Sequence, residues 1–143
     1  MHVKRFGRNT VAVLALSACA VAGSASVASA KTVKFKVSCV SKIVGAGTTT
    51  DKCTSAALGK GTGKSTLIAP NQKSTGKYSK AGKCVSKGTT KVGTDGKQHV
   101  KGTITCKGGK GIFKKGAKGK FTAVGGLKNG IVTVDFSGTI KTK

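Results

Sequence analysis

Hydrophobic and polar side chains alternate with a period of two along several segments of this chain. The clearest of these segments are residues 32–37, 97–106 and 131–140. In the first of them, Val33, Phe35 and Val37 share one face and alternate with threonine and lysine. One apolar face and one polar face are typical of antiparallel β-sheet, and no amphipathic helical period of useful length follows residue 30. The pattern therefore predicts an all-β domain.

A turn sequence near the end of the chain predicts how two of these strands pair. Asn129-Gly130 suits a two-residue hairpin because both residues tolerate positive φ. In the register that such a turn sets, Phe121 faces Gly138, so that a large apolar residue meets a small one. The neighbouring pairs on this face follow the same rule, which is the filling expected inside a small barrel.

Four cysteines remain after residue 30. They are Cys39, Cys53, Cys84 and Cys106. An even number in a small exported domain predicts two disulfides, for which three pairings exist. Asp95-Gly96 predicts a second hairpin turn, and Cys84 and Cys106 each lie 11 residues from Asp95. We expect a Cys84–Cys106 bridge across this hairpin and, by elimination, a Cys39–Cys53 bridge. Because no C-x-x-C occurs and His99 is the one histidine after residue 30, we expect no metal site.

Residues 45–82 show little apolar periodicity. Glycines lie among serine, threonine and lysine, and the one apolar run, residues 67–69, precedes Pro70. We expect a weak strand there between mobile loops. Residues 59–65 read GKGTGKS, but a phosphate-binding P-loop needs a glycine five positions before Gly63, where this chain has Leu58. We interpret the run as a flexible loop with solvated lysines and expect no cofactor.

Residues 1–30 are typical of an export signal. Basic residues in the first ten positions precede an apolar run that is too short to span a bilayer, and an A-x-A cleavage site ends at Ala30. Cleavage there leaves a single domain, residues 31–143. Alternatively, residues 16–19 (LSAC) resemble a bacterial lipobox, in which Cys19 would be lipidated and anchor the domain at the outer face of the membrane. The sequence thus predicts a secreted or envelope protein without a transmembrane span.

The charge is strongly one-sided. The chain has 27 Lys and Arg against three Asp and Glu, and all 24 basic residues after Ala30 are lysines. Leu, Ile, Val and Phe make up about a fifth of residues 31–143, close to the limit below which charged chains are disordered. We therefore expect the fold to depend on its disulfides. Most lysines are evenly spread, as expected for the solvent face of strands. The densest cluster, named here the lysine patch, consists of Lys107, Lys110, Lys114, Lys115, Lys118 and Lys120.

Few residues suit acid–base catalysis. Asp135 and His99 fall on the polar faces of their segments, Asp95 lies in a predicted turn, and Asp51 lies in a predicted loop. General acid–base work requires a group held close to its proton, usually with a pKa shifted by burial. Tyr78 alone is a candidate to point into a cavity, and a single tyrosine is more typical of packing. We expect no enzymatic activity.

The most specific stretch is residues 108–121, GGKGIFKKGAKGKF. It resembles the Gly-Gly-Thr-Gly-x-Phe-x-x-Ala-x-Gly segment of the dirigent and allene oxide cyclase barrel group. It is also similar to the closing segment of small exported bacterial proteins assigned to that barrel. Lys110 replaces the threonine, and one extra residue separates Phe113 from Ala117. The resemblance covers residues 108–140 and implies an antiparallel barrel of about eight strands. A β-sandwich is the alternative that the alternation leaves open.

Two main functions follow from these observations. The first is electrostatic association of the lysine-rich surface, above all the lysine patch, with anionic polymers or surfaces such as cell-wall polymers, lipopolysaccharide or nucleic acid. Sequence-specific recognition of nucleic acid is not expected, because lysine lacks the planar fork with which arginine reads base edges. The alternative, implied by the resemblance, is a barrel that holds a small apolar ligand. A third reading, a cell-surface lipoprotein, depends on Cys19. Steep salt dependence is expected of the first function and not of the second.

Overall fold

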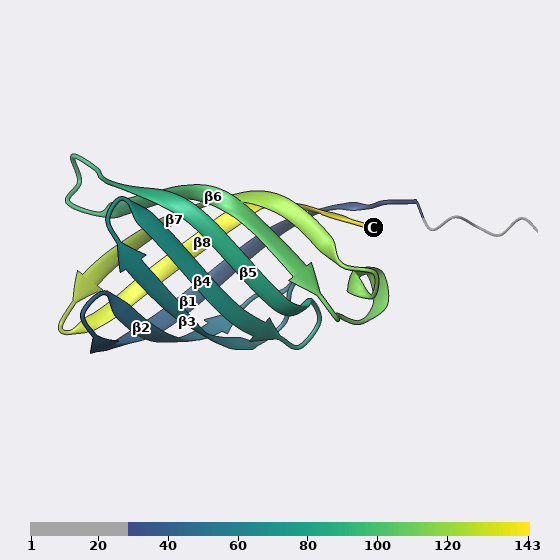
Figure 1. Ribbon diagram of the computed structural model, residues 1–143, viewed down its shortest axis with the longest axis horizontal. Coiled ribbons are helices and arrows are strands. Elements are labelled where there is room, and N and C mark those ends of the chain that lie inside the picture. Colours follow the sequence, from purple (N-terminus) through teal and green to yellow (C-terminus); the bar gives the residue numbers. More distant parts are fainter. Residues whose placement is uncertain (1–28) are drawn as a thin grey trace, which may run out of the picture.

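The protein folds into a single closed antiparallel barrel of eight strands (Figure 1). The computed structural model describes residues 29–143. The strands are β1 (Thr32–Gly45), β2 (Thr48–Thr54), β3 (Gly61–Ile68), β4 (Asn71–Tyr78), β5 (Gly82–Val92), β6 (Gln98–Lys107), β7 (Ala117–Lys128) and β8 (Ile131–Thr142). A short 3₁₀ helix, η1 (Gly111–Phe113), lies between β6 and β7. The predicted all-β class is confirmed.

Closure of the barrel distinguishes it from the sandwich alternative. Each strand pairs with the next along the chain, and β1 pairs with β8 from Thr32↔Lys141 to Ser41↔Val132. Since every strand has two neighbours, inward and outward side chains alternate around the whole ring. The apolar faces predicted in β1, β6 and β8 point inward, and the lysine and threonine faces point outward.

The two predicted hairpins both form, but one turn differs from the prediction. Lys128 pairs with Ile131, and Phe121 faces Gly138, as the two-residue turn at Asn129-Gly130 requires. In the β5–β6 hairpin the last pair is Val92↔Gln98, so the loop has five residues rather than two. The backbone N–H of Gly93 donates to the Lys97 carbonyl, which closes this wider loop.

Residues 45–82 form three strands, β2, β3 and β4, so the expectation of one weak strand between mobile loops is wrong. The Gly-rich run 59–65 belongs mostly to β3, where Gly63 pairs with Asp51 on one side and Gly76 on the other. The alternation in these strands is present, but it sets outward lysine and threonine against inward glycine, serine and glutamine. An apolar period is therefore absent even though the strand period is intact.

Both predicted disulfides are present. Cys39 is bonded to Cys53 across β1 and β2, and Cys84 is bonded to Cys106 across β5 and β6. In each case the two residues face each other in the strand register, and their side chains are buried in the barrel.

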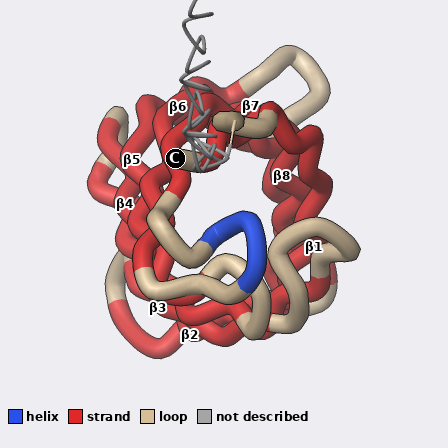
Figure 2. Tube along the Cα trace, turned by 90° about the vertical axis from the view of Figure 1, so that its right-hand side faces the viewer, coloured by secondary structure: helices blue, strands red, loops and turns tan. Residues whose placement is uncertain are grey.

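One end of the barrel is covered by loops that are joined by backbone hydrogen bonds. The β2–β3, β4–β5 and β6–β7 connections meet there, and Leu58, Ala81 and Phe113 are 0%, 0% and 2% exposed. The Leu58 carbonyl accepts from the N–H groups of Lys80 and Ala81, and the Lys80 carbonyl accepts from Lys110. Figure 2 looks onto this end and shows η1 lying across the ring of strands. We call it the closed end.

Two sequence predictions concern the start of the chain. The proposed signal, residues 1–30, falls almost entirely outside the described residues, and Cys19 falls outside them as well. Within residues 29–143, no helix has the length and apolarity needed to cross a membrane.

Candidate functional site

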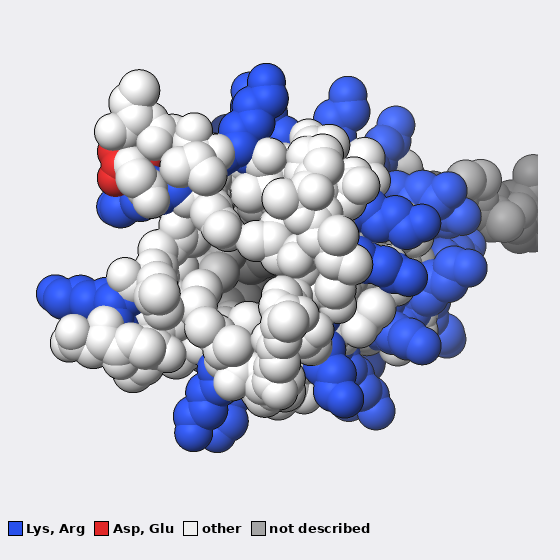
Figure 3. All heavy atoms as spheres, turned by 60° about the vertical axis from the view of Figure 1, so that its left-hand side comes forward, with Lys and Arg blue, Asp and Glu red and all other residues white. Residues whose placement is uncertain are grey.

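The opposite end of the barrel is open and leads into a cavity of about 350 Å³. We call this end the mouth. In Figure 3, which turns this end toward the viewer, the surface is hollowed between the strand ends, and lysine side chains gather mainly on the side away from the hollow. The cavity wall is mostly apolar. Its apolar members include Ile43, Leu67, Val100, Ala123, Leu127, Val132, Val134 and Phe136. Small inward residues on β7, such as Gly125, leave the space unfilled.

Aliphatic side chains surround the mouth. All four hairpins at this end carry exposed large apolar residues on or beside their tips. They are Ile43, Val44, Ile68, Val92, Leu127 and Ile131, which are 47–73% exposed. Exposed aliphatics gathered at one end of a molecule are unlike the single, scattered ones common on soluble domains. We call these six residues the apolar rim.

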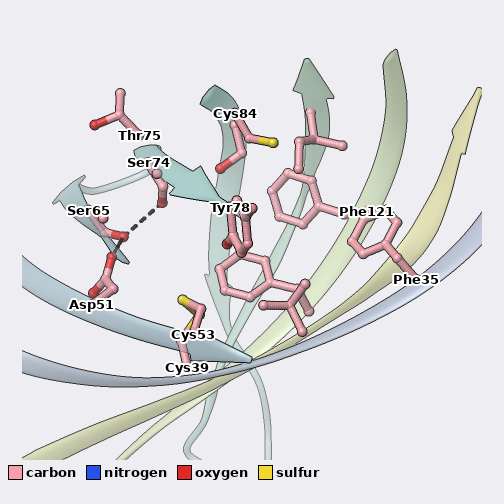
Figure 4. A pocket seen from close by; sticks show the side chains of 16 residues that line it. Phe35, Cys39, Asp51, Cys53, Ser65, Ser74, Thr75, Tyr78, Cys84 and Phe121 are labelled. Carbon is pink, nitrogen blue, oxygen red and sulfur yellow. Dashed lines mark hydrogen bonds between the residues drawn. A yellow bond between two sulfur atoms is a disulfide. The ribbon is translucent and has the colours of Figure 1, made fainter. Parts of the chain in front are cut away.

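The barrel interior toward the closed end is filled. Phe35, Tyr78 and Phe121 point into it beside the Cys39–Cys53 disulfide (Figure 4), and the remaining space is about 30 Å³. The rings of Phe121 and Phe136 pack with centroids 5.5 Å apart at a tilt of 51°. This aromatic layer forms the floor of the mouth cavity, so the open volume is confined to one half of the barrel.

A chain of polar side chains lines the wall of β2, β3 and β4, between the floor and the mouth (Figure 4). Asp51 is buried on β2, with 8% of its surface exposed. Ser65 Oγ donates to Asp51 Oδ2 over 2.5 Å, and Thr49 Oγ1 donates to Asp51 Oδ1 over 2.8 Å. Ser65 Oγ and Ser74 Oγ are 2.8 Å apart, and Gln72 Nε2 donates to Ser74 Oγ. Four of these five residues, namely Thr49, Asp51, Ser65 and Gln72, also line the mouth cavity.

Counting the hydroxyl protons assigns the donor and the acceptor of each hydrogen bond between these polar side chains. Because Ser65 gives its one hydroxyl proton to Asp51, Ser74 must donate to Ser65. Ser74 then has no proton left, so Gln72 presents its amide nitrogen to Ser74. The Gln72 carbonyl oxygen accepts no hydrogen bond from any described residue, although Gln72 is only 9% exposed.

Asp51 also affects the pKa of Tyr78, which belongs to the aromatic layer. Burial raises the pKa of Tyr78 to about 12, and the negative charge of Asp51 adds to this rise. Both effects disfavour the phenolate. Tyr78 therefore stays a neutral phenol throughout the physiological pH range.

The outer surface carries the lysines, and every lysine of residues 29–143 is exposed. Lys77, Lys83 and Lys107 face one another in sequence across β4, β5 and β6. Lysine side chains on β1–β6 border an outer groove of about 1080 Å³. They are Lys42, Lys52, Lys64, Lys77, Lys83 and Lys107. All six members of the lysine patch are exposed, on the β6–β7 connection and the adjoining strands.

The remaining acids lie on the outside, as the sequence predicts. Asp135 accepts a hydrogen bond from Ser38 over 2.7 Å on the outer face, and Asp95 pairs with His99 at 3.0 Å. The pKa of Asp95 lies below its ordinary value because the Lys97 backbone N–H donates to it, with a smaller contribution from His99. Neither carboxylate reaches the cavity.

Asp51 is the residue that sequence reasoning misplaced. It lies in β2 and not in a loop, and its side chain points into the barrel. Ser65, Ser74 and Gln72 were not singled out at all. The available signal was the outward period of Lys73, Thr75 and Lys77, which places Gln72 and Ser74 on the inward face. Tyr78, the one candidate named for a cavity, does line the barrel interior.

Comparisons of the chain with protein-family models, curated proteins and solved structures find no match. The eight-stranded barrel is the architecture that the resemblance to the dirigent and allene oxide cyclase group implies. The family relationship itself stays a prediction.

Proposed function

We propose that the protein binds a small, largely apolar ligand in the mouth cavity. The observation that carries the proposal is the cavity itself, with about 350 Å³ of space, a mostly apolar wall and one open end. This volume lies within the range of small-molecule sites, and because the cavity is open at the mouth, a ligand longer than the cavity can extend past the apolar rim. The apolar rim offers such a ligand a path of entry.

Binding of an uncharged, environment-sensitive fluorophore such as N-phenyl-1-naphthylamine tests this proposal. We expect saturable fluorescence enhancement that changes little between 0.05 and 0.5 M salt, because an uncharged probe makes no ion pairs. Gly125→Leu should abolish the enhancement, since a Cβ at Gly125 meets only ordinary contacts with Val134 and the longer side chain fills the cavity. Val124→Leu, at the adjacent outward position, is the matched control. Equal binding by both variants would place the probe elsewhere.

The role proposed is binding and not catalysis. Both carboxylate oxygens of Asp51 accept hydrogen bonds from hydroxyl groups, and the raised pKa of Tyr78 keeps its phenol from acting as a base near neutral pH. These two groups are therefore better suited to hold a ligand than to move protons.

A second candidate function is electrostatic association with anionic polymers outside the cell. The observation that favours it is the outer groove, in which Lys77, Lys83 and Lys107 face one another without an intervening acid. Neighbouring like charges on a sheet repel, and a polyanion would relieve that repulsion. The lysine patch predicted from the sequence shares Lys107 with this groove and remains the other candidate contact surface.

Two variants with equal charge separate these surfaces. One replaces groove lysines (Lys52, Lys64, Lys77 and Lys83) with glutamine, and the other replaces patch lysines (Lys114, Lys115, Lys118 and Lys120). With duplex DNA as the probe, removing four contacting lysines should reduce the slope of log affinity against log salt by up to about 3.6. The variant with the larger loss identifies the surface. Equal losses would indicate diffuse attraction, and no loss in either would contradict the function.

We further propose that the protein works outside the cytoplasm. Two buried disulfides support this, because such bonds form and persist in oxidising compartments. Secretion as a free domain and anchoring through Cys19 remain the two proposed forms, and mass spectrometry of the mature N-terminus separates them. A first residue of Lys31 supports free release, and a lipidated Cys19 supports the anchor.

A further inference from the structure

We infer that the ligand of the mouth cavity is an amphipathic primary amine, whose ammonium group binds between Asp51 and Gln72 while its apolar part lies against the cavity wall. This inference rests on the proposed ligand-binding function and adds the chemistry of the ligand's head group.

The first observation is a buried negative charge without a cation. Asp51 is 8% exposed, and its hydrogen-bond partners are the uncharged hydroxyls of Thr49 and Ser65. Every lysine of the described chain lies on the exposed surface. A buried carboxylate is costly unless an opposite charge pairs with it. A cation that enters the cavity would supply that charge.

The second observation is independent of the first. The Gln72 carbonyl oxygen is a buried acceptor that receives no proton from the residues described. Reversing the amide does not satisfy it, because Ser74 must give its only proton to Ser65. Unpaired buried acceptors are rare in folded proteins and call for a donor. Gln72 and Asp51 line the same cavity, and our inference is that a single donor group bound there contacts both acceptors.

A primary ammonium group fits these two acceptors better than other head groups. It carries three N–H donors and no acceptor, and a hydrogen bond between two charged groups is about twice as strong as a neutral one. A neutral hydroxyl has one donor and cannot satisfy both oxygens. A carboxylate would be repelled by Asp51. The rest of the wall, with Val100, Val132 and Val134, matches an alkyl or aryl body.

Three ligands with the same eight-carbon chain test the inference on the unaltered protein. They are 1-octylamine, 1-octanol and octanoate, each used at pH 7 and 0.15 M salt to displace N-phenyl-1-naphthylamine. We expect octylamine to bind at least tenfold more tightly than octanol, and octanoate to bind most weakly. Octanoate binding most tightly would overturn the inference, because the lysine-rich surface and not Asp51 would then control selection.

The variants Asp51→Asn and Asp135→Asn locate the selectivity. Each removes one negative charge, but Asp135 lies on the outer face. We expect Asp51→Asn to bring the octylamine and octanol affinities within threefold of each other, and Asp135→Asn to leave their ratio unchanged. An unchanged ratio in Asp51→Asn overturns the inference. Near-ultraviolet circular dichroism checks that the variant is folded, and the ligand series on the unaltered protein stands without it.

Failure of the inference differs from failure of the proposed function. If the three ligands displace the probe equally well, ligand binding in the cavity holds and the head-group assignment is wrong. If the probe does not bind and calorimetry detects no heat of binding for any of the three, both are wrong.

Discussion

Removing either disulfide should destabilise the barrel by about 3 kcal/mol. The two bonds close separate loops, with sequence separations of 14 for Cys39–Cys53 and 22 for Cys84–Cys106. Restricting loops of these lengths in the unfolded chain is worth about 3.0 and about 3.4 kcal/mol at 25 °C. Because the loops do not overlap along the chain, the two losses should add to about 6 kcal/mol. Natural domains have a total stability of about 5–15 kcal/mol, so losing both bonds should leave the barrel marginal or unfolded.

Urea unfolding followed by circular dichroism measures these losses, and urea leaves the charge screening unchanged. The variants are Cys39→Ala/Cys53→Ala, Cys84→Ala/Cys106→Ala and the combination of all four. For a domain of this size, a loss of about 3 kcal/mol corresponds to a fall in melting temperature of about 12 °C. Losses below about 1 kcal/mol in both single-bond variants would refute the reasoning. They would show that the barrel closure between β1 and β8 supplies the stability on its own.

Three further predictions follow from single sites. Tyr78 is the one tyrosine of the chain, so its ionisation can be followed by absorbance at 295 nm, and its pKa should be about 12 in the folded protein and about 10 in urea. Its contribution to the free energy of unfolding is therefore complete below pH 10 and is lost as the pH rises to 12. Equal pKa values in the folded and unfolded protein would contradict the burial of Tyr78. Gly138→Ala should lower the melting temperature strongly because the added Cβ would clash with the backbone carbonyl oxygen of Lys120, whereas Gly126→Ala, where a Cβ meets open space, should not. The pKa of Asp95, measured by NMR, should lie below 3.8, because the backbone N–H of Lys97 donates a hydrogen bond to its carboxylate.

The parts of the fold that the sequence predicted are those where apolar burial and turn chemistry agree. The β7–β8 hairpin is the clearest case, because Asn129 and Gly130 both adopt the positive φ that the turn requires. The turn sets the register, and the register explains why Phe121 lies opposite Gly138. The Cys84–Cys106 bridge followed from symmetry about Asp95, although the loop there is wider than predicted.

Strands β2–β4 escaped prediction for a physical reason. Hydrophobic periodicity detects a strand only when its inward side chains are apolar, and here they are mainly glycine, serine, aspartate and glutamine. Asp51 was assigned to a loop on the same grounds. The outward period of lysine and threonine was the usable signal, but polar residues are common in loops as well. The strand register, in which Ser65 pairs with Ser74 and Asp51 pairs with Gly63, is what shows that the polar residues of β2, β3 and β4 lie on one wall of the barrel.

The small and polar inward residues that leave β2–β4 without an apolar period also explain the cavity. The large inward side chains Phe35, Phe121 and Phe136 come from β1, β7 and β8, and they fill the closed half against the small residues of β3 and β4. Toward the mouth, the buried inward positions of β7 are the small residues Ala123 and Gly125, and Leu127 lies at the rim, so neither wall fills the space. Protein interiors are close-packed, and an unfilled volume of this size lowers stability. A ligand that binds only the folded state, at a concentration one hundred times its dissociation constant, raises the free energy of unfolding by about 2.7 kcal/mol. A bound ligand would therefore offset the stability lost to the unfilled cavity. Octylamine should therefore raise the melting temperature of the unaltered protein and leave that of Gly125→Leu unchanged.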